Sequence, residues 1–342
     1  MREYKKYWWA LVAVVTIAFG ILGYYGVEVY REAPPVVSFA DKNGKIIVEQ
    51  EQIYKGQEAW QSIGGMQVGS VWGHGAYQAP DWTADWLHKE LVAFMDIKAN
   101  QLYGVKFDAL NAEQQANIKA LTKSEYRTNT LKNGVITISD ERIAAAKVVR
   151  DEYNGLFGND PKYQKLRENY AMKNNTLPDE TRRQRLTNFF FWTSWAAATN
   201  RPNHDATYTN NWPHEPLINN VPTTENVMWS VASIVFLLAG IGLLVWGWSF
   251  LHKHESEPQL PDTDPISKVQ LTPSQRALGK YVFLTVALFI VQILLGGLTA
   301  HYTVEGQRFF GIPLSDWFPY ALVRTWHLQS ASSLPACSWL RW

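Results

Sequence analysis

The sequence predicts a mainly α-helical membrane protein, in which part of a transmembrane helical bundle is joined to a mostly helical domain outside the membrane. Three apolar, uncharged stretches carry this prediction, at 7–27, 226–251 and 281–300. Each has about 20 residues or more, and at a rise of about 1.5 Å per residue such helices cross a hydrocarbon core of about 30 Å. A fourth span is predicted to begin near Ala321. The long segment between the first two stretches has no run that could span.

The composition excludes several classes of protein. The chain is 46% hydrophobic but its mean hydropathy is slightly negative, so membrane and soluble parts coexist. A formal net charge of +1 offers no basic face for nucleic acid. The single cysteine, Cys337, excludes a disulfide framework, a thiolate metal site and a covalently attached haem upstream of it.

Basic residues near the first span predict the orientation of the chain. Arg2, Lys5 and Lys6 precede this span, and cytoplasmic flanks are enriched in such residues, so the N-terminus is predicted to be cytoplasmic. No cleavage site of small residues follows the apolar run, which favours an uncleaved anchor over a signal peptide. The predicted organisation is an anchor at 1–28, an extracytoplasmic domain at 29–224, the start of a transmembrane bundle at 225–329 and a tail at 330–342.

Within the outer domain the patterns are mostly helical. Apolar residues recur at helical spacing over 85–102, Asp140 is a predicted N-cap, and Pro178 is predicted to open a third helix. The segment 36–48 predicts a hairpin that turns at Asn43-Gly44.

A glycine-rich segment at 64–77 could suggest a phosphate-binding loop. No Gly-Lys-Ser/Thr follows it and no apolar strand leads into it. Tight turns and close backbone packing around Trp72 are therefore the favoured interpretation.

His301 and Glu305 lie where the third span meets the outer surface, four residues apart and so on one helical face. Such a pair can hydrogen-bond a quinol hydroxyl and accept its proton, with Phe309 and Phe310 as an apolar wall. Simple anchoring at the membrane interface is the alternative.

His327 begins the fourth span, three residues after Arg324 and on the same face. An imidazole in a membrane helix is unfavourable unless it is paired or bound to a metal. The spacing leaves two interpretations open, a haem iron ligand and a hydrogen bond between helices. If His327 binds a haem iron, Arg324 could pair with a haem propionate.

Read together, these segments resemble quinol-dependent nitric oxide reductase from the first span to Gln329. The segments that carry the resemblance are 73–82 (GHGAYQAPDW), 84–87 (ADWL), 199–202 (TNRP), 208–216 (YTNNWPHEP), 300–306 (AHYTVEG) and 324–329 (RTWHLQ).

The resemblance implies a multi-pass protein of the bacterial cytoplasmic membrane. In that family an outer domain of cytochrome c ancestry, without its haem, is fused to a bundle that holds a low-spin haem b, a high-spin haem and a non-haem iron. Electrons from quinol reduce two NO to N2O and water. The missing C-x-x-C-H motif agrees with the quinol-dependent branch.

The same resemblance implies roles for individual residues. His327 matches an axial ligand of the low-spin haem, and His301, Glu305 and Phe309 match the quinol-binding residues. A weaker match places Gly75 and Tyr77 near a calcium, or a water in its place, beside the haem propionates.

After Gln329 the chain departs from the family, which continues with a long apolar helix. The residues 330–342 suggest a frameshift or a truncated gene model, and Pro335 is expected to break the fourth helix. The high-spin haem and the non-haem iron belong to the complete family member, so the chain as given is expected to be a fragment without NO reductase activity of its own.

Two other functions compete with this interpretation. A membrane-anchored sensor or binding module would need a cytoplasmic effector, for which the loop at 252–279 is short. A haem-copper oxygen reductase would share the helical bundle but not the tryptophan-rich motifs of the outer domain.

Overall fold

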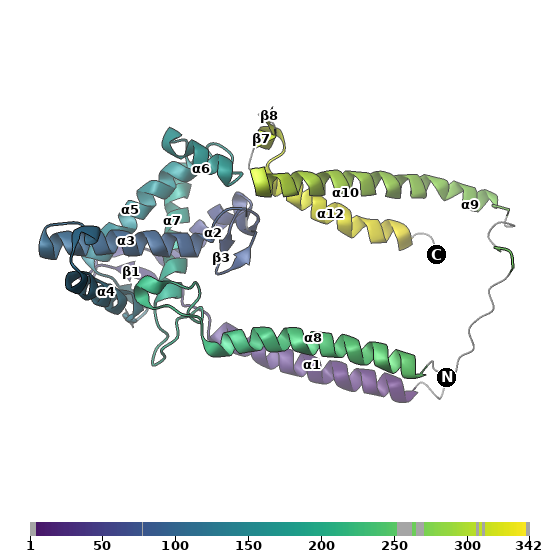
Figure 1. The fold of residues 1–342 in the computed structure, drawn as a ribbon, viewed down its shortest axis with the longest axis horizontal. Helices are drawn as coiled ribbons and strands as arrows, with labels where there is room; N and C mark the ends of the chain where they lie inside the picture. Colours follow the sequence, from purple (N-terminus) through teal and green to yellow (C-terminus); the bar gives the residue numbers. More distant parts are fainter. Residues whose placement is uncertain are drawn as a thin grey trace.

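In a computed structural model of the chain, a helical domain lies at one end and long helices extend from one side of it (Figure 1). The structure describes residues 5–76, 78–251, 262–264, 270–305, 308–309 and 312–339. The α-helices are α1 (Lys5–Arg31), α2 (Gln50–Ser62), α3 (Trp82–Tyr103), α4 (Ala112–Arg127), α5 (Asp140–Phe157), α6 (Gln164–Asn169), α7 (Glu180–Ala198), α8 (Thr224–Leu251), α9 (Pro273–Ala277), α10 (Gly279–Glu305), α11 (Leu314–Trp317) and α12 (Tyr320–Trp339). The short strands are β1 (Ser38–Ala40), β2 (Ile46–Val48), β3 (Ser70–Val71), β4 (His74–Gly75), β5 (Leu131–Lys132), β6 (Val135–Thr137), β7 (Arg308–Phe309) and β8 (Ile312–Pro313).

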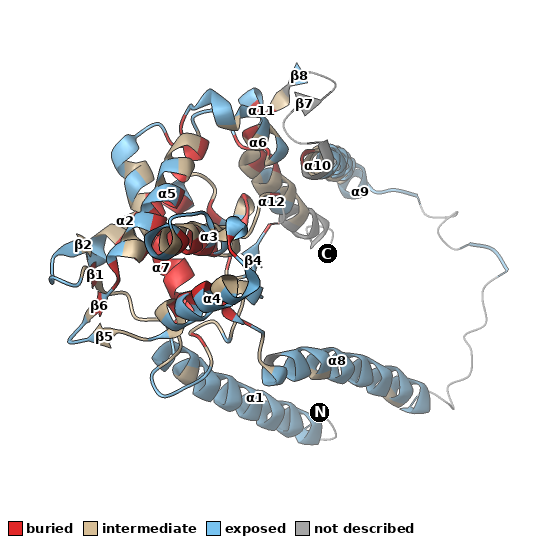
Figure 2. Ribbon diagram, turned by 60° about the vertical axis from the view of Figure 1, so that its left-hand side comes forward, coloured by how far each residue is buried: buried red, intermediate tan, exposed pale blue. Residues whose placement is uncertain are grey.

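The helices α1, α8 and α10 contain the three predicted spans, and all three are long and apolar enough to cross a membrane. Their side chains are exposed along most of their length, as the pale blue of α1 and α8 shows (Figure 2). Exposed apolar surface costs about 25 cal/mol per Å² in water, so these helices need lipid or further helices around them. The prediction of three spans is confirmed, and the chain is a membrane protein with a mostly helical domain.

The fourth predicted span is α12, which begins at Tyr320, one residue before the predicted start. It lies along α10, and both helices end or begin beside the helical domain (Figure 1). The expectation that Pro335 breaks this helix is wrong, because α12 continues to Trp339. A proline removes one backbone hydrogen bond from a helix, and membrane helices tolerate that loss.

The core of the domain forms around α7, which packs against α2, α3 and α5 and is buried along its second half (Figure 2). Aromatic rings fill this core. The Trp82 ring stacks on Phe190 with centroids 5.7 Å apart, and Trp60, Tyr153 and Phe157 contact the same two rings edge-on or tilted. Part of the high tryptophan content therefore serves the core of the domain rather than the membrane interface.

The helix predicted over 85–102 is confirmed as α3, but the starts of two others differ from prediction. Ser139, not Asp140, caps α5, because its hydroxyl accepts a hydrogen bond from the Arg142 amide. Similarly, Asp179 caps α7, so the helix begins two residues after Pro178. In both cases the capping residue, whose side chain accepts a hydrogen bond from a free backbone amide of the first turn, lies one position away from the residue predicted to start the helix.

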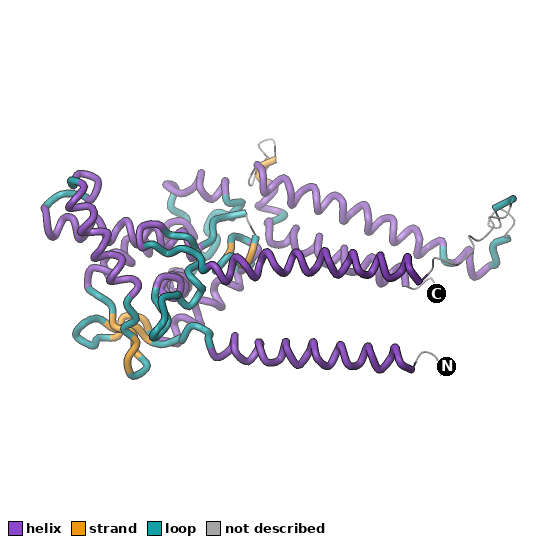
Figure 3. Tube along the Cα trace, turned by 60° about the horizontal axis from the view of Figure 1, so that its bottom comes forward, coloured by secondary structure: helices purple, strands orange, loops and turns teal. Residues whose placement is uncertain are grey.

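A small sheet with the strand order β2-β1-β6-β5 closes one side of the domain; Figure 3 shows its strands in orange. The predicted hairpin is β1 and β2, with Gly44 at φ 82° in the turn. A second hairpin, β5 and β6, turns at Asn133 and Gly134 (φ 51° and 77°). The parallel pairing of β1 with β6 joins the two hairpins.

Candidate functional site

The glycine-rich segment at 64–77 forms the 3-10 turn η1 (Gly65–Gln67) and the hairpin of β3 and β4. Trp72 and Gly73 make the turn with positive φ, and the Trp72 indole donates to the Thr193 carbonyl at 3.0 Å. Gly75 has φ 147°, and a Cβ there would lie 2.5 Å from the Gly69 carbonyl oxygen. The predicted tight turns and close packing are therefore confirmed. Tyr77, the other residue matched to a calcium site, lies outside the described residues.

Asp81 ties this hairpin to α3. One of its carboxylate oxygens accepts from the Ser70 hydroxyl at 2.7 Å and from the Gly73 amide at 2.8 Å. The other accepts from the Ala84 amide at 3.0 Å and so caps the helix. A carboxylate with these bonds holds the loop in place.

The same loop contacts the membrane helices at their outer ends. Gln78 donates from Nε2 to the Tyr302 carbonyl at 2.5 Å, and the Tyr302 hydroxyl donates to the Phe318 carbonyl at 2.6 Å. On the other side of the loop, Gln67 and Thr325 are hydrogen-bonded at 2.9 Å. Three sequence segments that carried the resemblance, 73–82, 300–306 and 324–329, therefore meet at one junction.

The predicted quinol-binding residues lie at this end of α10. His301 is half-buried, with its ring 6.0 Å from that of Tyr302. Glu305 is the last residue of α10 and Phe309 is in β7, and only their backbone is described. Phe310 lies outside the described residues. The backbone thus brings the three matched residues to one end of a helix, beside the domain.

A groove of about 520 Å³ opens at the junction. Its walls come from the turn after α2, the segment 171–176 and the start of α12. Met172 and Tyr320 are among the apolar walls, while Gln67 and Thr325 add polar groups and Lys173 lies at the edge. An apolar slot with few polar groups is typical of small-molecule sites. Of the predicted site residues whose side chains the structure describes, namely Gly75, His301, Arg324 and His327, none lines it.

His327 faces α10, where its Nδ1 lies 3.0 Å from the Gln292 carbonyl oxygen. Its Nε2 makes no hydrogen bond within the described part of the chain. Arg324, one turn earlier, makes no hydrogen bond or ion pair with a described residue. The hydrogen bond of His327 to α10 is the contact between helices that the sequence allowed. It also agrees with a haem ligand, because a histidine that binds a metal through one ring nitrogen commonly donates a hydrogen bond from the other to a backbone carbonyl. The described residues hold no group of three or more His, Cys, Asp or Glu that could bind a metal ion.

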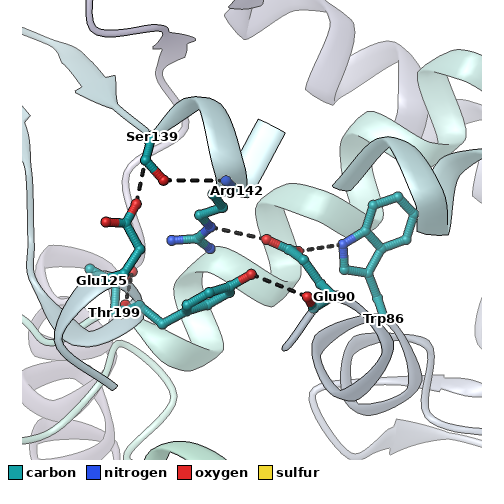
Figure 4. A network of polar contacts seen from close by, with 7 residues as sticks. Trp86, Glu90, Glu125, Ser139, Arg142 and Thr199 are labelled. Atoms are coloured by element: carbon teal, nitrogen blue, oxygen red, sulfur yellow. Dashed lines mark hydrogen bonds and ion pairs between the residues drawn. The ribbon is translucent and has the colours of Figure 1, made fainter. Parts of the chain in front are cut away.

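Sequence reasoning missed a buried ion pair in the domain, shown in Figure 4. The fully buried Glu90 accepts from the Arg142 guanidinium at 3.0 Å and from the Trp86 indole at 2.7 Å. Burial raises the pKa of the Glu90 carboxyl, against the effect of Arg142, and raises the pKa of Tyr126 well above its ordinary value. The guanidinium also lies over the Tyr126 ring, 4.1 Å from its centroid. The network joins α3, α4 and α5 inside the core, and Arg142 also lines a small cavity of about 280 Å³ beside Glu125 and Thr130.

The segments 199–202 and 208–216 form the loop that leads to α8. Arg201 donates to the carbonyls of Thr207 and Tyr208 and pairs with Glu32, just after α1. Asn211 accepts from the Thr207 amide and from Arg127. These residues shape the connection between the domain and its first two membrane helices.

Comparison with known families places most of the outer domain in a known family. The model of the cytochrome c-like domain of the nitric oxide reductase protein NorB matches residues 37–214, just over half of the chain. The matched range begins before β1 and ends in the loop before α8. No curated protein matches the chain.

Proposed function

The chain belongs to the NorB family of nitric oxide reductases, and on this premise we propose that it carries the quinol-oxidising and electron-entry part of a membrane nitric oxide reductase. The family match supports an oxidoreductase. The quinol as electron donor is our inference from the missing C-x-x-C-H motif and from the residues at the outer end of α10.

We propose that His327 is an axial ligand of a haem b. The observation that carries this role is the hydrogen bond from Nδ1 to the Gln292 carbonyl. Nε2 has no partner among the described residues, so its lone pair can bind a metal. Arg324 would hold a haem propionate, since its guanidinium is also without a described partner and matches a carboxylate in geometry and charge. When bound, such a haem accepts and passes on single electrons.

The residues at the outer end of α10 would bind and deprotonate the quinol. His301 lies beside the buried Tyr302, and Glu305 follows one turn later on the same helix. A histidine and a carboxylate at this spacing can accept the two hydroxyl protons and release them to the outer surface. The bond from Gln78 to the Tyr302 carbonyl would keep this helix end in place.

We assign electron entry, rather than NO chemistry, to the elements described above. By resemblance, the high-spin haem and the non-haem iron would be held by other helices. We also propose, from the resemblance, that Gly75 and Tyr77 lie near a calcium, or a water in its place, beside the haem propionates. The orientation proposed from the sequence places 29–224 outside the cytoplasmic membrane.

The proposal is tested by separating ligation from proton acceptance in membranes that contain the haem-loaded chain. His327→Ala should remove the haem signal, because an axial bond is lost. In contrast, His301→Ala and Glu305→Ala should keep the haem spectrum and slow its reduction by added quinol by roughly ten- to a hundred-fold, which corresponds to losing a hydrogen bond of about 1–3 kcal/mol. If His301→Ala abolished the haem spectrum and His327→Ala did not, the two roles would be wrongly assigned.

A further inference from the structure

The contact between His327 and α10 determines which ring nitrogen carries the proton. Nδ1 lies 3.0 Å from the Gln292 carbonyl oxygen, and a carbonyl oxygen only accepts hydrogen bonds. In a neutral imidazole Nδ1 must therefore be the protonated nitrogen, and the lone pair must lie on Nε2. This is the tautomer that a ligand binding iron through Nε2 requires.

Gly296 makes this contact possible. A Cβ at Gly296 would lie 2.8 Å from Cε1 of His327, 3.3 Å from Nδ1 and 3.5 Å from Nε2. The ring therefore lies directly against the backbone of α10, one turn beyond Gln292, in the space that any other side chain would occupy. Because α10 and α12 pack along each other, the backbone of α10 is held in place, and the imidazole ring is the group that a side chain at this position would displace.

The conformation of Gly296 gives no other reason for a glycine. The residue lies inside α10 and does not have a positive φ, so an L side chain could adopt its backbone conformation. Glycine is among the least favourable residues in a helix interior. The next residue, Gly297, has nothing within 4 Å of the position of a Cβ and provides a matched control in the same turn.

We propose that Gly296 and the Gln292 carbonyl are positioning groups that hold His327 as the Nδ1-protonated tautomer with Nε2 presented for a ligand. The use of Nε2 as a haem ligand rests on the proposed function, but the tautomer and the role of Gly296 do not. The prediction concerns a helix contact that exists before any haem binds.

The test uses the haem-free chain in lipid bilayers, labelled with ¹⁵N in its histidine rings and observed by solid-state NMR. The chain has eight histidines, so the His327 signals are those that disappear in His327→Ala. We expect His327 of the unmutated chain to have a protonated Nδ1 and a bare Nε2. A protonated Nε2 with a bare Nδ1 would overturn the proposal whatever the two glycine variants show.

The two glycines then separate positioning from general helix effects. Gly297→Ala should leave the His327 signals in place, whereas Gly296→Ala should remove the Nδ1-protonated signature. Unchanged signals from the other seven histidines would show that the variant has folded. If Gly296→Ala kept the His327 signature, the proposed role of Gly296 would be wrong.

Haem binding gives a second readout. In titrations with haem, Gly296→Ala should weaken binding by roughly ten- to a hundred-fold, the usual effect of losing the partner that orients a metal ligand, and Gly297→Ala by less than about twofold. If His327→Ala bound haem as the unmutated chain does while the NMR result held, the proposed ligand would be wrong and the positioning contact would stand. Equal haem binding by Gly296→Ala and Gly297→Ala, with haem lost in His327→Ala, would reject the importance of Gly296 for the site.

Discussion

Gln78 donates a hydrogen bond from its side-chain amide to the backbone carbonyl of Tyr302, 2.5 Å away, and so joins the helical domain to the outer end of a membrane helix. Both residues are at least 95% buried, so water cannot replace the bond. The adjacent residue, His301, is one of those assigned to quinol. The domain therefore contacts the end of α10 directly beside the residue proposed to bind quinol.

Gln78→Leu should loosen this junction. Leucine keeps a similar volume but removes the donor, and a buried acceptor that loses its partner costs about 1–3 kcal/mol. We expect a lower midpoint of thermal unfolding for the chain in detergent. Gln57→Leu, at an exposed position of α2, should change stability by no more than about 0.5 kcal/mol. Equal midpoints for both variants would show that the bond contributes little.

Gly75→Ala should be strongly destabilising. Its Cβ would lie 2.5 Å from the Gly69 carbonyl oxygen and 2.8 Å from Ser70 Cα, and these are backbone atoms, which cannot rotate away as a side chain can. Overpacking and an unfavourable φ together should cost about 2–5 kcal/mol, measured by thermal unfolding. Gly44→Ala is the control, because Gly44 also has a positive φ but open space around it. A loss no larger than that of Gly44→Ala would contradict the close approach.

The pH dependence of stability should reveal the buried Glu90. Burial raises the pKa of this carboxyl above its ordinary value of 4.5, so the folded domain binds the proton more tightly than the unfolded chain. The contribution of this proton to stability is fully present below pH 4.5 and is lost as the pH rises through the raised pKa. Relative to Glu90→Gln, the unmutated domain should therefore lose stability with rising pH in urea unfolding followed by tryptophan fluorescence.

Glu141 provides a control of opposite sign. A hydrogen bond from Lys98, 2.6 Å long, lowers the pKa of the Glu141 carboxyl. Its contribution is present above pH 4.5 and is lost as the pH falls. Relative to Glu141→Gln, the unmutated domain should gain stability as the pH rises. Slopes of the same sign for the two variants would refute this account of the Glu90 carboxyl.

The orientation of the chain can be tested with fusions. Alkaline phosphatase joined near Asp160, at an exposed turn of the domain, should be active because we place this segment outside the cytoplasm. A fusion at Asp262, between α8 and α9, should be inactive. Green fluorescent protein at the same two sites should give the reverse pattern, and fluorescence at Asp160 would reject the proposed orientation.

The sequence predicted the elements whose signals are local. Uncharged stretches marked the membrane helices, apolar spacing marked α3, and Asn43-Gly44 marked the first hairpin. The same dipeptide, Asn133-Gly134, turns the second hairpin, but the dipeptide alone does not predict one. Its strands are only two and three residues long, too short for an alternating pattern to identify.

The contacts that build the candidate site could not be read from the sequence, because they join distant segments. Gln78 contacts Tyr302, and Gly296 contacts His327, only in the packed structure. Glu90 has a charged side chain on a helix that apolar spacing predicted, and spacing alone does not show that such a residue is buried. The family resemblance identified the segments, but not which residues of each segment meet.

The pairing of β1 with β6, and the packing of α2 against α7, also determine when the domain can fold during synthesis. Gly56 of α2 lies against the Arg185 carbonyl and Phe189 of α7, near the end of the domain. The N-terminal elements therefore stay without their partners until the ribosome has made nearly all of the domain. The aromatic core, in which Trp82 stacks on Phe190 of α7, can therefore assemble only late in synthesis, and until then the unpaired N-terminal elements are open to proteases.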